Sequence, residues 1–220
     1  MIAKPPYFLI LIGSLTLASW LSPICAEQEA TDSPAEKSAA AVAAPEKQPQ
    51  RMELIRGKLV VAVPGEWPAV RSRNNIIKYE FSIPAEETQN GPVDTGLGDR
   101  GSGRMTMASA GGGVEANIAR WVGQFRDADG KPLGEKDKKI VRKKVAGLDV
   151  YLVDFMGDFH DKPRGPFGPT VERAEYRMLA AIIPVEENGT WFIKCYGPQA
   201  TLEGAEKLFL AMIETMEFTP

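Results

Sequence analysis

Residues 176–196 read YRMLAAIIPVEENGTWFIKCY, and this stretch decides the fold. It consists of two apolar runs on either side of the pair Asn188-Gly189. An Asn-Gly pair between two such runs is the strongest short-range signal for a β-hairpin, because both residues tolerate the positive φ of a tight turn. The runs therefore predict two antiparallel strands, Tyr176 to Val185 and Thr190 to Tyr196.

Five further segments, met on working outward from this hairpin, have the pattern of strands. They are Lys58–Val63, Ile76–Ile83, Arg104–Ser109, Lys139–Val145 and Leu148–Phe155. In Ile76–Ile83 the apolar side chains alternate with polar ones, among them Glu80, which predicts a half-buried strand. The last two segments flank Ala146-Gly147 and predict a second hairpin, and residues 216–218 add a short terminal strand.

Two segments have helical periodicity instead. Residues 114–125 place apolar side chains at i, i+4, i+7, i+8 and i+11, with Trp121 in the middle of this face. A second amphipathic helix runs over 202–213, with Thr201 as its N-cap. Strands joined by hairpins, together with two separated helices, indicate an α+β fold. We expect a mostly antiparallel sheet of about six to seven strands with two main helices.

The first 26 residues do not belong to this fold. Lys4 precedes an apolar run over 7–21, and Ala26 is a small residue at the expected cleavage site, which is the pattern of a secretory signal peptide. An uncleaved N-terminal anchor is one alternative, although a membrane span needs about 20 apolar residues. Lipid attachment at Cys25 is another. Each interpretation predicts an exported protein that is periplasmic, secreted or tethered to a membrane.

Residues 27–50 are dominated by Ala, Pro, Glu, Lys and Gln, and they contain no aromatic residue. Such a segment cannot bury enough apolar surface to offset the entropy lost on ordering, so we expect a disordered linker before a globular domain over 51–220. The formal net charge of the chain is −3, whereas a dedicated nucleic-acid-binding protein would be strongly basic. Nucleic acid is therefore not expected as a partner.

The scarcity of cysteine and histidine limits the chemistry. With two cysteines and one histidine, a Cys₄ or Cys₂His₂ zinc site is impossible, and a Cys-His or Ser-His-Asp enzyme would have to use His160. Cys195 shares a strand face with Trp191 and Ile193, so we expect a buried, inert thiol without an intramolecular disulfide.

His160 lies in the sequence DFMGDFHD (154–161), which leads into a predicted loop over 157–173. Asp158 and His160 would project to the same side of an extended chain, as in a carboxylate-imidazole metal site or a general acid-base pair. A hydrolase that uses His160 with Asp158 or Asp161 is the catalytic alternative. We favour a solvated loop with a turn after Asp161, and assign no catalytic or metal-binding residue.

Residues 111–116 read GGGVEA and fit the glycine pattern of a dinucleotide-binding turn. The next strand, however, starts a hairpin and not a parallel βαβ unit, and no acidic residue follows where a ribose would need one. We therefore expect a simple strand-to-helix turn and no cofactor.

Six basic residues gather near the start of the predicted strand Lys139–Val145. They are Lys136, Lys138, Lys139, Arg142, Lys143 and Lys144. This 136–144 basic run could meet anionic lipid or another polyanion, which would make the protein a peripheral binder of anionic surfaces. We favour the other interpretation, the solvated side of an edge strand whose lysines block edge-to-edge pairing.

Asn117, Arg120 and Gln124 form a polar stripe beside the apolar face of the first helix. Arg120 could bind a carboxylate or phosphate through two parallel hydrogen bonds. It could equally hold loop carbonyls or pair with an acidic neighbour, and we favour this structural role. The candidate ligand contacts are therefore Asn117, Arg120, Gln124, Asp158 and His160.

Several motifs together resemble a family of uncharacterised exported bacterial proteins. They are NIARWVGQF (117–125) after the glycine-rich turn, TWFIKCYGP (190–198), PGEW (64–67) and a C-terminal helix followed by MEF (216–218). The order of elements is similar to the Mog1p/PsbP-like fold, an α/β/α sandwich around an antiparallel sheet. This resemblance implies a small binding or accessory protein without a shared catalytic centre.

The export signal, the linker and the lack of a catalytic constellation point to one function. We expect an exported, non-catalytic binding or accessory domain of the cell envelope. Its expected partner is another envelope protein, and peripheral membrane contact is a further option.

Overall fold

The computed structural model describes residues 47–72, 75–85, 101–163 and 167–220. The predicted signal peptide and residues 27–46 of the predicted linker lie outside these ranges. The strands are β1 (Gln50–Ile55), β2 (Leu59–Val63), β3 (Ala69–Val70), β4 (Ile77–Ile83), β5 (Gly103–Ala110), β6 (Phe125–Arg126), β7 (Lys138–Val145), β8 (Leu148–Asp161), β9 (Val171–Val185), β10 (Gly189–Pro198) and β11 (Glu217–Phe218). The helices are α1 (Val114–Val122), α2 (Gln199–Glu214) and the 3₁₀ helix η1 (Glu135–Asp137).

The main sheet has the order β3-β4-β5-β10-β9-β8-β6, and β7 also pairs with β8. Every one of these pairings is antiparallel. The two predicted hairpins are confirmed as β7-β8 and β9-β10, with Val145 opposite Leu148 and Val185 opposite Gly189. The main sheet has eight strands in the described residues. Two of them, β3 and β6, are only two residues long.

A second, three-stranded sheet has the order β1-β2-β11. The predicted terminal strand is present as β11, which pairs with β2. β1 is a strand that the sequence patterns did not predict, and it pairs antiparallel with β2 from Gln50 to Ile55. Its Leu54 is 1% exposed, so this small sheet is anchored in the main core.

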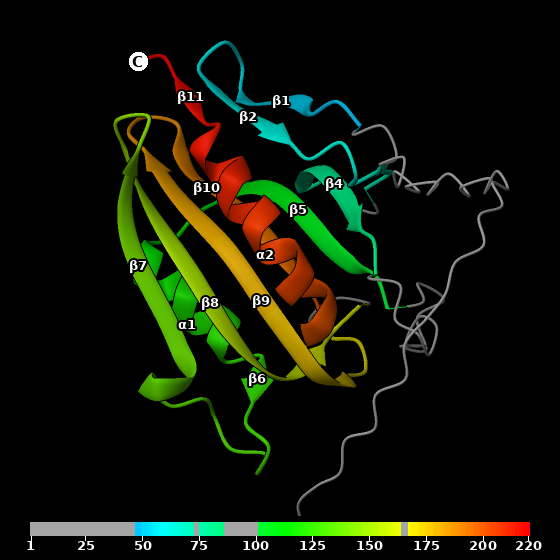
Figure 1. The fold of residues 1–220 in the computed structure, drawn as a ribbon. Coiled ribbons are helices and arrows are strands. Elements are labelled where there is room, and N and C mark those ends of the chain that lie inside the picture. The colour runs from blue at the N-terminus through cyan, green and yellow to red at the C-terminus, as the bar shows by residue number, and fades with distance from the viewer. Residues whose placement is uncertain (1–46, 73–74, 86–100, 164–166) are drawn as a thin grey trace, which may run out of the picture. The chain divides into compact units, whose positions relative to one another are not determined.

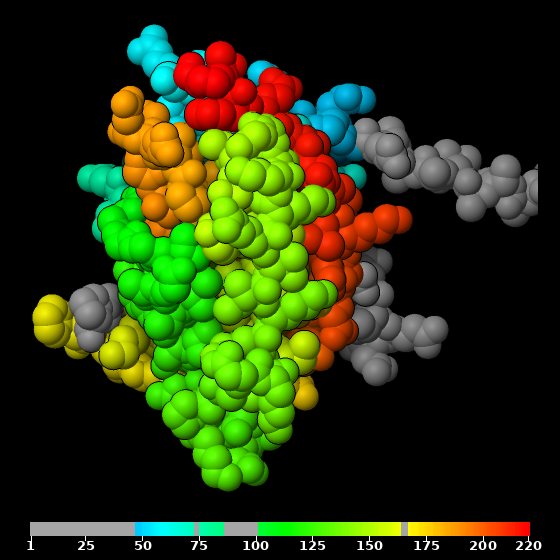
Figure 2. Space-filling view, turned by 90° about the vertical axis from the view of Figure 1, so that its left-hand side faces the viewer, coloured from blue at the N-terminus to red at the C-terminus, as the bar shows by residue number. Residues whose placement is uncertain are grey.

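The two helices lie on opposite faces of the main sheet (Figure 1). One hydrophobic core contains Leu202, Phe209 and Ile213 of α2, and the other contains Trp121 of α1. The space-filling view of the sheet edge shows the same layers, with the yellow-green β7 region between the green α1 side and the red α2 side (Figure 2). The predicted α+β sandwich is therefore confirmed.

Strand alternation explains why one sheet serves two cores. On β10, Ile193 and Cys195 belong to the α2 core, whereas Phe192 belongs to the α1 core. The thiol of Cys195 is fully buried, as predicted, and burial raises its pKa.

Two predicted helix ends differ from the structure. α1 ends at Val122, and Phe125 lies in β6, where it pairs with Phe159 of β8. Phe125 is fully buried beside Trp121, so the apolar periodicity continues past the helix although the helix does not. Thr201 is inside α2 and not its N-cap, and its hydroxyl donates to the carbonyl of Gly101 at 2.7 Å.

The predicted loop over 157–173 is strand at both of its ends. β8 continues to Asp161 and β9 starts at Val171, with a register shift between Gly157 and Phe159. A Cβ on Gly157 would lie 2.3 Å from the carbonyl oxygen of Arg126, so β6 can approach β8 only at a glycine. The glycine that suggested a loop in fact permits close strand packing.

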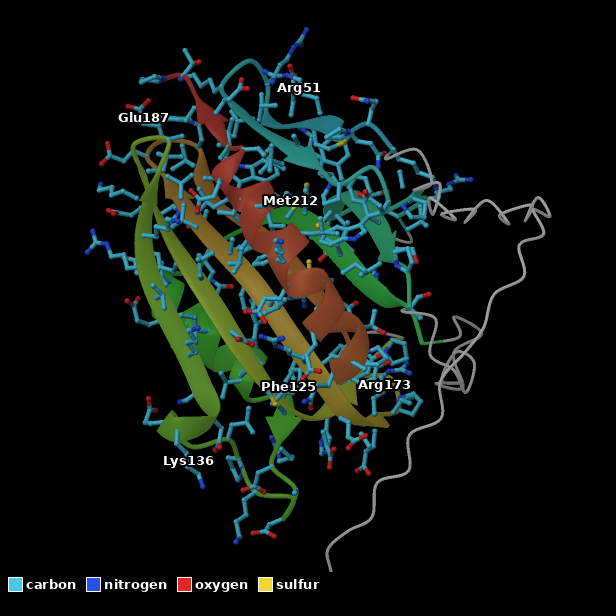
Figure 3. All side chains as sticks on the ribbon, in the orientation of Figure 1. Arg51, Phe125, Lys136, Arg173, Glu187 and Met212 are labelled. Atoms are coloured by element: carbon cyan, nitrogen blue, oxygen red, sulfur yellow. The ribbon has the colours of Figure 1, made fainter. Side chains whose placement is uncertain are left out.

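The long β9 spans the molecule from end to end. Glu187 lies at the tip of the β9-β10 hairpin and Arg173 near the opposite end of β9 (Figure 3). Glu187 has φ 63° and Gly189 has φ 78°, which are the left-handed residues of this turn.

Candidate functional site

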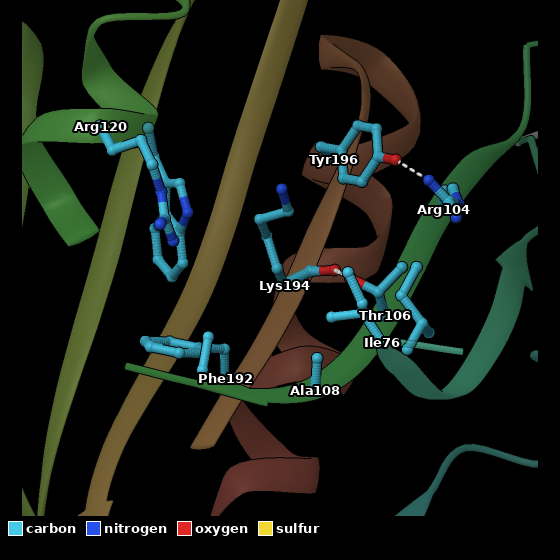
Figure 4. Close-up of a pocket in the computed structure, with 11 residues that line it drawn as sticks. Ile76, Arg104, Thr106, Ala108, Arg120, Phe192, Lys194 and Tyr196 are labelled. Atoms are coloured by element: carbon cyan, nitrogen blue, oxygen red, sulfur yellow. Dashed lines mark hydrogen bonds between the residues drawn. The ribbon is translucent and has the colours of Figure 1, made fainter. Parts of the chain in front are cut away.

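A pocket lies on the α1 face of the sheet, between α1 and strands β5 and β10 (Figure 4). On β10, Phe192, Lys194 and Tyr196 occupy alternate positions and face the same side. Opposite them in register, β5 carries Ala108, Thr106 and Arg104. The short side chains of Ala108 and Thr106 on β5, beside the long ones on β10, leave a hollow of about 200 Å³.

Lys194 is the central cation of this pocket. Its Nζ lies 4.9 Å from the ring centroid of Tyr196 and 5.7 Å from that of Trp121. Within the described ranges, no hydrogen bond or ion pair engages this ammonium group. Burial, reinforced by the positive charges of Arg104 and Arg120, lowers the pKa of Lys194 to about 8.

Arg104 enters the pocket from β5 and is fixed on both sides. Its Nε donates to Glu80 Oε1 at 2.7 Å, and its Nη1 donates to the hydroxyl of Tyr196. The side chain of Glu80 is 6% exposed, although it lies on the polar face of the strand that was predicted to be half-buried. Its other oxygen, Oε2, is buried without a partner among the described residues.

Arg120 reaches the pocket from the last turn of α1 and is exposed. Its Nη2 donates to Oδ1 of Asn117, and no loop carbonyl or carboxylate holds it among the described residues. Asn117 is the buried member of the predicted stripe at 1% exposure. Its Nδ2 donates to the carbonyl of Gly113 at 2.9 Å, so Asn117 secures the turn that precedes the helix.

The chemistry of the lining is cationic and aromatic. The lining residues are Ile76, Ile77, Arg104, Thr106, Ala108, Ala110, Arg120, Trp121, Phe192, Lys194 and Tyr196. No aspartate or glutamate is among these described residues, and Glu80 lies behind Arg104, which donates to it. Such a hollow can hold an anion through charge and an apolar group through its rings.

Residues of the predicted His160 cluster are each engaged elsewhere. Asp161 accepts two hydrogen bonds from Arg173 at 2.9 and 3.0 Å, and Asp158 Oδ1 accepts from the backbone N–H of Glu175 at 3.2 Å. His160 stands 3.7 Å from Glu172 on the neighbouring strand. No three His, Cys, Asp or Glu side chains of the described ranges lie together as a metal site would need.

The 136–144 basic run forms the outer strand β7, and its charges are divided between the two faces of the sheet. Arg142 and Lys144 pair with Asp149 at 2.6 and 3.2 Å. Lys143 pairs with Glu214 of α2. A polyanion would need these cations side by side on one open face, and this arrangement does not provide that.

The remaining candidates are Gln124 and the glycine-rich turn over 111–116. Gln124 follows α1, and its backbone carbonyl accepts a hydrogen bond from the N–H of His160 at 2.8 Å. Gly112, in the glycine-rich turn, has φ 92° and joins β5 to α1. The strand after α1, β6, pairs antiparallel with β8, so the dinucleotide-binding arrangement is absent here.

Three of the pocket residues, Arg104, Lys194 and Tyr196, were not predicted. One signal was present in the sequence. Lys194 lies between Ile193 and Cys195, on a strand that is buried on both of its faces. Sequence reasoning assigned only one buried face to this strand. A lysine in the other buried face is the feature that marks the pocket.

Solved structures to which this chain is similar include the following three. Cyanobacterial PsbP from Synechocystis sp. PCC 6803 is 12% identical with a TM-score of 0.44, covering 83% of this chain and 98% of that one. LpqN of Mycobacterium tuberculosis, involved in cell envelope biogenesis, is 8% identical with a TM-score of 0.44, covering 79% and 91%. The Ran-binding protein Mog1p of Saccharomyces cerevisiae is 10% identical with a TM-score of 0.41, covering 78% and 96%.

These structures include PsbP and Mog1p, after which the expected fold is named. No protein-family model and no curated protein matches the sequence. Within the described residues, no helix has the length and apolar character that a membrane span requires.

Proposed function

We propose that this chain is an exported, non-catalytic binding domain of the cell envelope, and that it holds its partner at the pocket beside α1. The observation that carries the proposal is the lining of that pocket, in which cations and aromatic rings meet without a lining carboxylate among the described residues. Export rests on the apolar run and small residue of the N-terminal pattern.

The arrangement of titratable groups supports binding over catalysis. A hydrolase needs a general base within hydrogen-bond reach of a nucleophile or water in a cleft. The acidic neighbours Asp158 and Asp161 are engaged by other groups, and His160 does not line the pocket. Arg120 and Lys194, in contrast, present cationic donors with little competition from the protein's own acceptors.

The experiment is affinity capture from the envelope extract of the source organism. The bait is the purified protein, compared with the double variant Arg120→Gln/Lys194→Met and with Lys207→Gln, a matched control on an exposed position of α2. We expect a partner that the wild type and the control enrich and that the double variant loses. Thermal melting of all three baits checks that each is folded.

Two outcomes would contradict the proposal. If all three baits enrich the same components, the pocket is not the binding site. If no component is enriched on the wild type over a bare resin, the protein is not a binding domain for the envelope components of that extract.

A further inference from the structure

The pocket beside α1 carries a surplus of positive charge that the described residues do not neutralise. Arg104, Arg120 and Lys194 bring three cations. Two carboxylates act on them, but Glu80 is held by Arg104, and Asp161, which attracts Lys194, is held by Arg173. The polar contact of Arg120 is to an uncharged amide oxygen of Asn117. Burying or half-burying a cation without an acceptor costs free energy. In the free protein, the pocket therefore lacks an anion to balance its positive charge.

Lys194 is the strongest sign of a missing acceptor. Its ammonium stands among the rings of Trp121 and Tyr196, and its three donors find no oxygen in the described ranges. Contact with ring faces compensates for part of the lost hydration, but it leaves the N–H donors unused. An oxyanion in the hollow would accept from Lys194 and from the free edge of the Arg120 guanidinium.

The walls of the pocket select the part of the ligand that carries the anion. Trp121 is held edge-to-face against Phe192, with ring centroids 5.4 Å apart and an interplanar angle of 78°. Both residues are 5% exposed, so their positions are fixed by the core. Beside them, Ala108 leaves room on the floor. Fixed rings next to an open floor favour a flat apolar group over a flexible polar one.

We infer that the pocket beside α1 binds a small organic oxyanion, a carboxylate or phosphate carried on a flat apolar ring. Arg120 and Lys194 bind the oxyanion, Arg104 orients Tyr196 and adds charge, and Trp121 and Phe192 contact the ring. The hollow of about 200 Å³ limits the ligand to a small one. This inference rests on the proposed binding function and names the chemical class that the site recognises.

The test is a calorimetric titration of the purified protein with four probes. Benzoate and phenyl phosphate carry both features, and they distinguish a carboxylate from a phosphate. Benzamide keeps the ring without the charge, and inorganic phosphate keeps the charge without the ring. We expect benzoate or phenyl phosphate to bind at least about tenfold more tightly than benzamide and inorganic phosphate.

The variants locate the binding site. Lys194→Met and Arg120→Gln should each weaken binding of the better probe by about tenfold or more, whereas Lys207→Gln should leave it unchanged. Arg120 is exposed, so its variant remains informative even if Lys194→Met affects folding. Tryptophan fluorescence, to which Trp121 contributes as one of the chain's four tryptophans, gives an independent readout of ring contact.

Several results would overturn the inference. If the better of benzoate and phenyl phosphate binds no more tightly than benzamide, charge is not recognised. If it binds no more tightly than inorganic phosphate, the ring is not recognised. No binding of any probe would exclude the ligand class. Pocket-dependent capture without probe binding would contradict this inference alone, and probe binding without capture would contradict the proposed envelope partner alone.

Discussion

Lys194 shows how burying a single charged residue costs stability. Its pKa falls to about 8 because burial, Arg104 and Arg120 disfavour the ammonium, and Asp161 offsets this only in part. Tyr196 and Glu80 are the other titratable groups that face this strand position, and Glu80 is held by Arg104. The charged lysine therefore destabilises the folded state near neutral pH.

Replacing Lys194 by methionine should therefore stabilise the protein. We expect the free energy of unfolding at pH 7 to rise by about 1–3 kcal/mol, measured by denaturant titration. The sign also predicts a pH dependence. Between the folded pKa of about 8 and the ordinary lysine value of 10.5, the unfolded state binds more protons, so wild-type stability from this residue rises with pH. The variant should lack that rise, and a variant less stable than the wild type at pH 7 would contradict the account.

His160 is a residue whose substitution we expect to have little effect on stability or binding. It lies on β8 with 31% of its side chain exposed, and its acidic neighbour Glu172 is 78% exposed. We expect His160→Ala to change the free energy of unfolding by less than about 1 kcal/mol and to leave partner capture intact. A hydrolytic activity that is lost in this variant would establish the catalytic alternative in its place.

Trp121 is the residue of α1 that is buried in the second hydrophobic core. It was predicted to lie in the middle of the buried helix face, and it is 5% exposed against Phe192. Trp121→Ala should cost about 3–5 kcal/mol of stability, which is a large part of the roughly 5–15 kcal/mol of an ordinary domain. Thermal melting measures this, and an unchanged melting temperature would show that α1 does not close the second core.

The polar residues were harder to predict than the apolar ones. Helical periodicity identifies the face of Trp121, but it cannot say that Asn117 turns inward to the carbonyl of Gly113. Arg120 was predicted to hold a carbonyl or carboxylate, and it contacts an amide beside the pocket instead. Hydrogen bonding depends on distances of a few tenths of an ångström, and sequence spacing does not fix these.

At the scale of elements, α2 is attached to the sheet by a buried arginine. Arg177 of β9 has 6% of its side chain exposed, and it donates to both oxygens of Asp154 on β8 and to Glu206 of α2. Removing one partner of a buried ion pair leaves an uncompensated charge, which commonly costs about 3–5 kcal/mol. Arg177→Ala should therefore lower the free energy of unfolding by that amount.

The matched control for this network is Arg51 of β1. Its pair with Glu217 has both side chains more than 60% exposed, at 63% and 62%. Exposed pairs contribute little to stability because water and salt screen them, so Arg51→Ala should have a small effect in the same denaturant titration. Equal losses for the two variants would show that burial does not decide the contribution of Arg177.

The predicted boundaries of strands were wrong where local sequence signals and tertiary contacts disagree. The strand β8 passes through Gly157 because β6 packs against it there, and sequence composition alone suggests a loop at the same place. β1 was missed because QRMELI follows a polar, proline-rich segment, and its ladder with β2 contains a β-bulge between Glu53 and Ile55. Hairpins with glycine-containing turns were predicted correctly, since their signal is local.

At the scale of the whole molecule, the start and the end of the described domain meet in one small sheet. β1 and β11 flank β2, and Arg51 of β1 pairs with Glu217 of β11 at 2.8 Å. Gln50 also donates from its side chain to the carbonyl of Trp67 at 2.8 Å. The folded unit therefore includes residue 50, one residue before the predicted domain start at 51.

Limited proteolysis tests the predicted boundary between linker and domain. The composition of 27–50 predicts rapid cleavage N-terminal to β1, and the pairing of β1 with β2 predicts protection from Gln50 onward. We expect a stable product that begins between about residues 40 and 50 and melts like the full chain. A shorter chain that begins at residue 56 should melt lower, because it loses Leu54, a core side chain at 1% exposure whose removal costs about 2–5 kcal/mol. Resistance of 27–46 with cleavage inside β1 or β2 would place the boundary elsewhere. Equal melting of the two shortened chains would show that the small sheet contributes nothing to the core beneath α2.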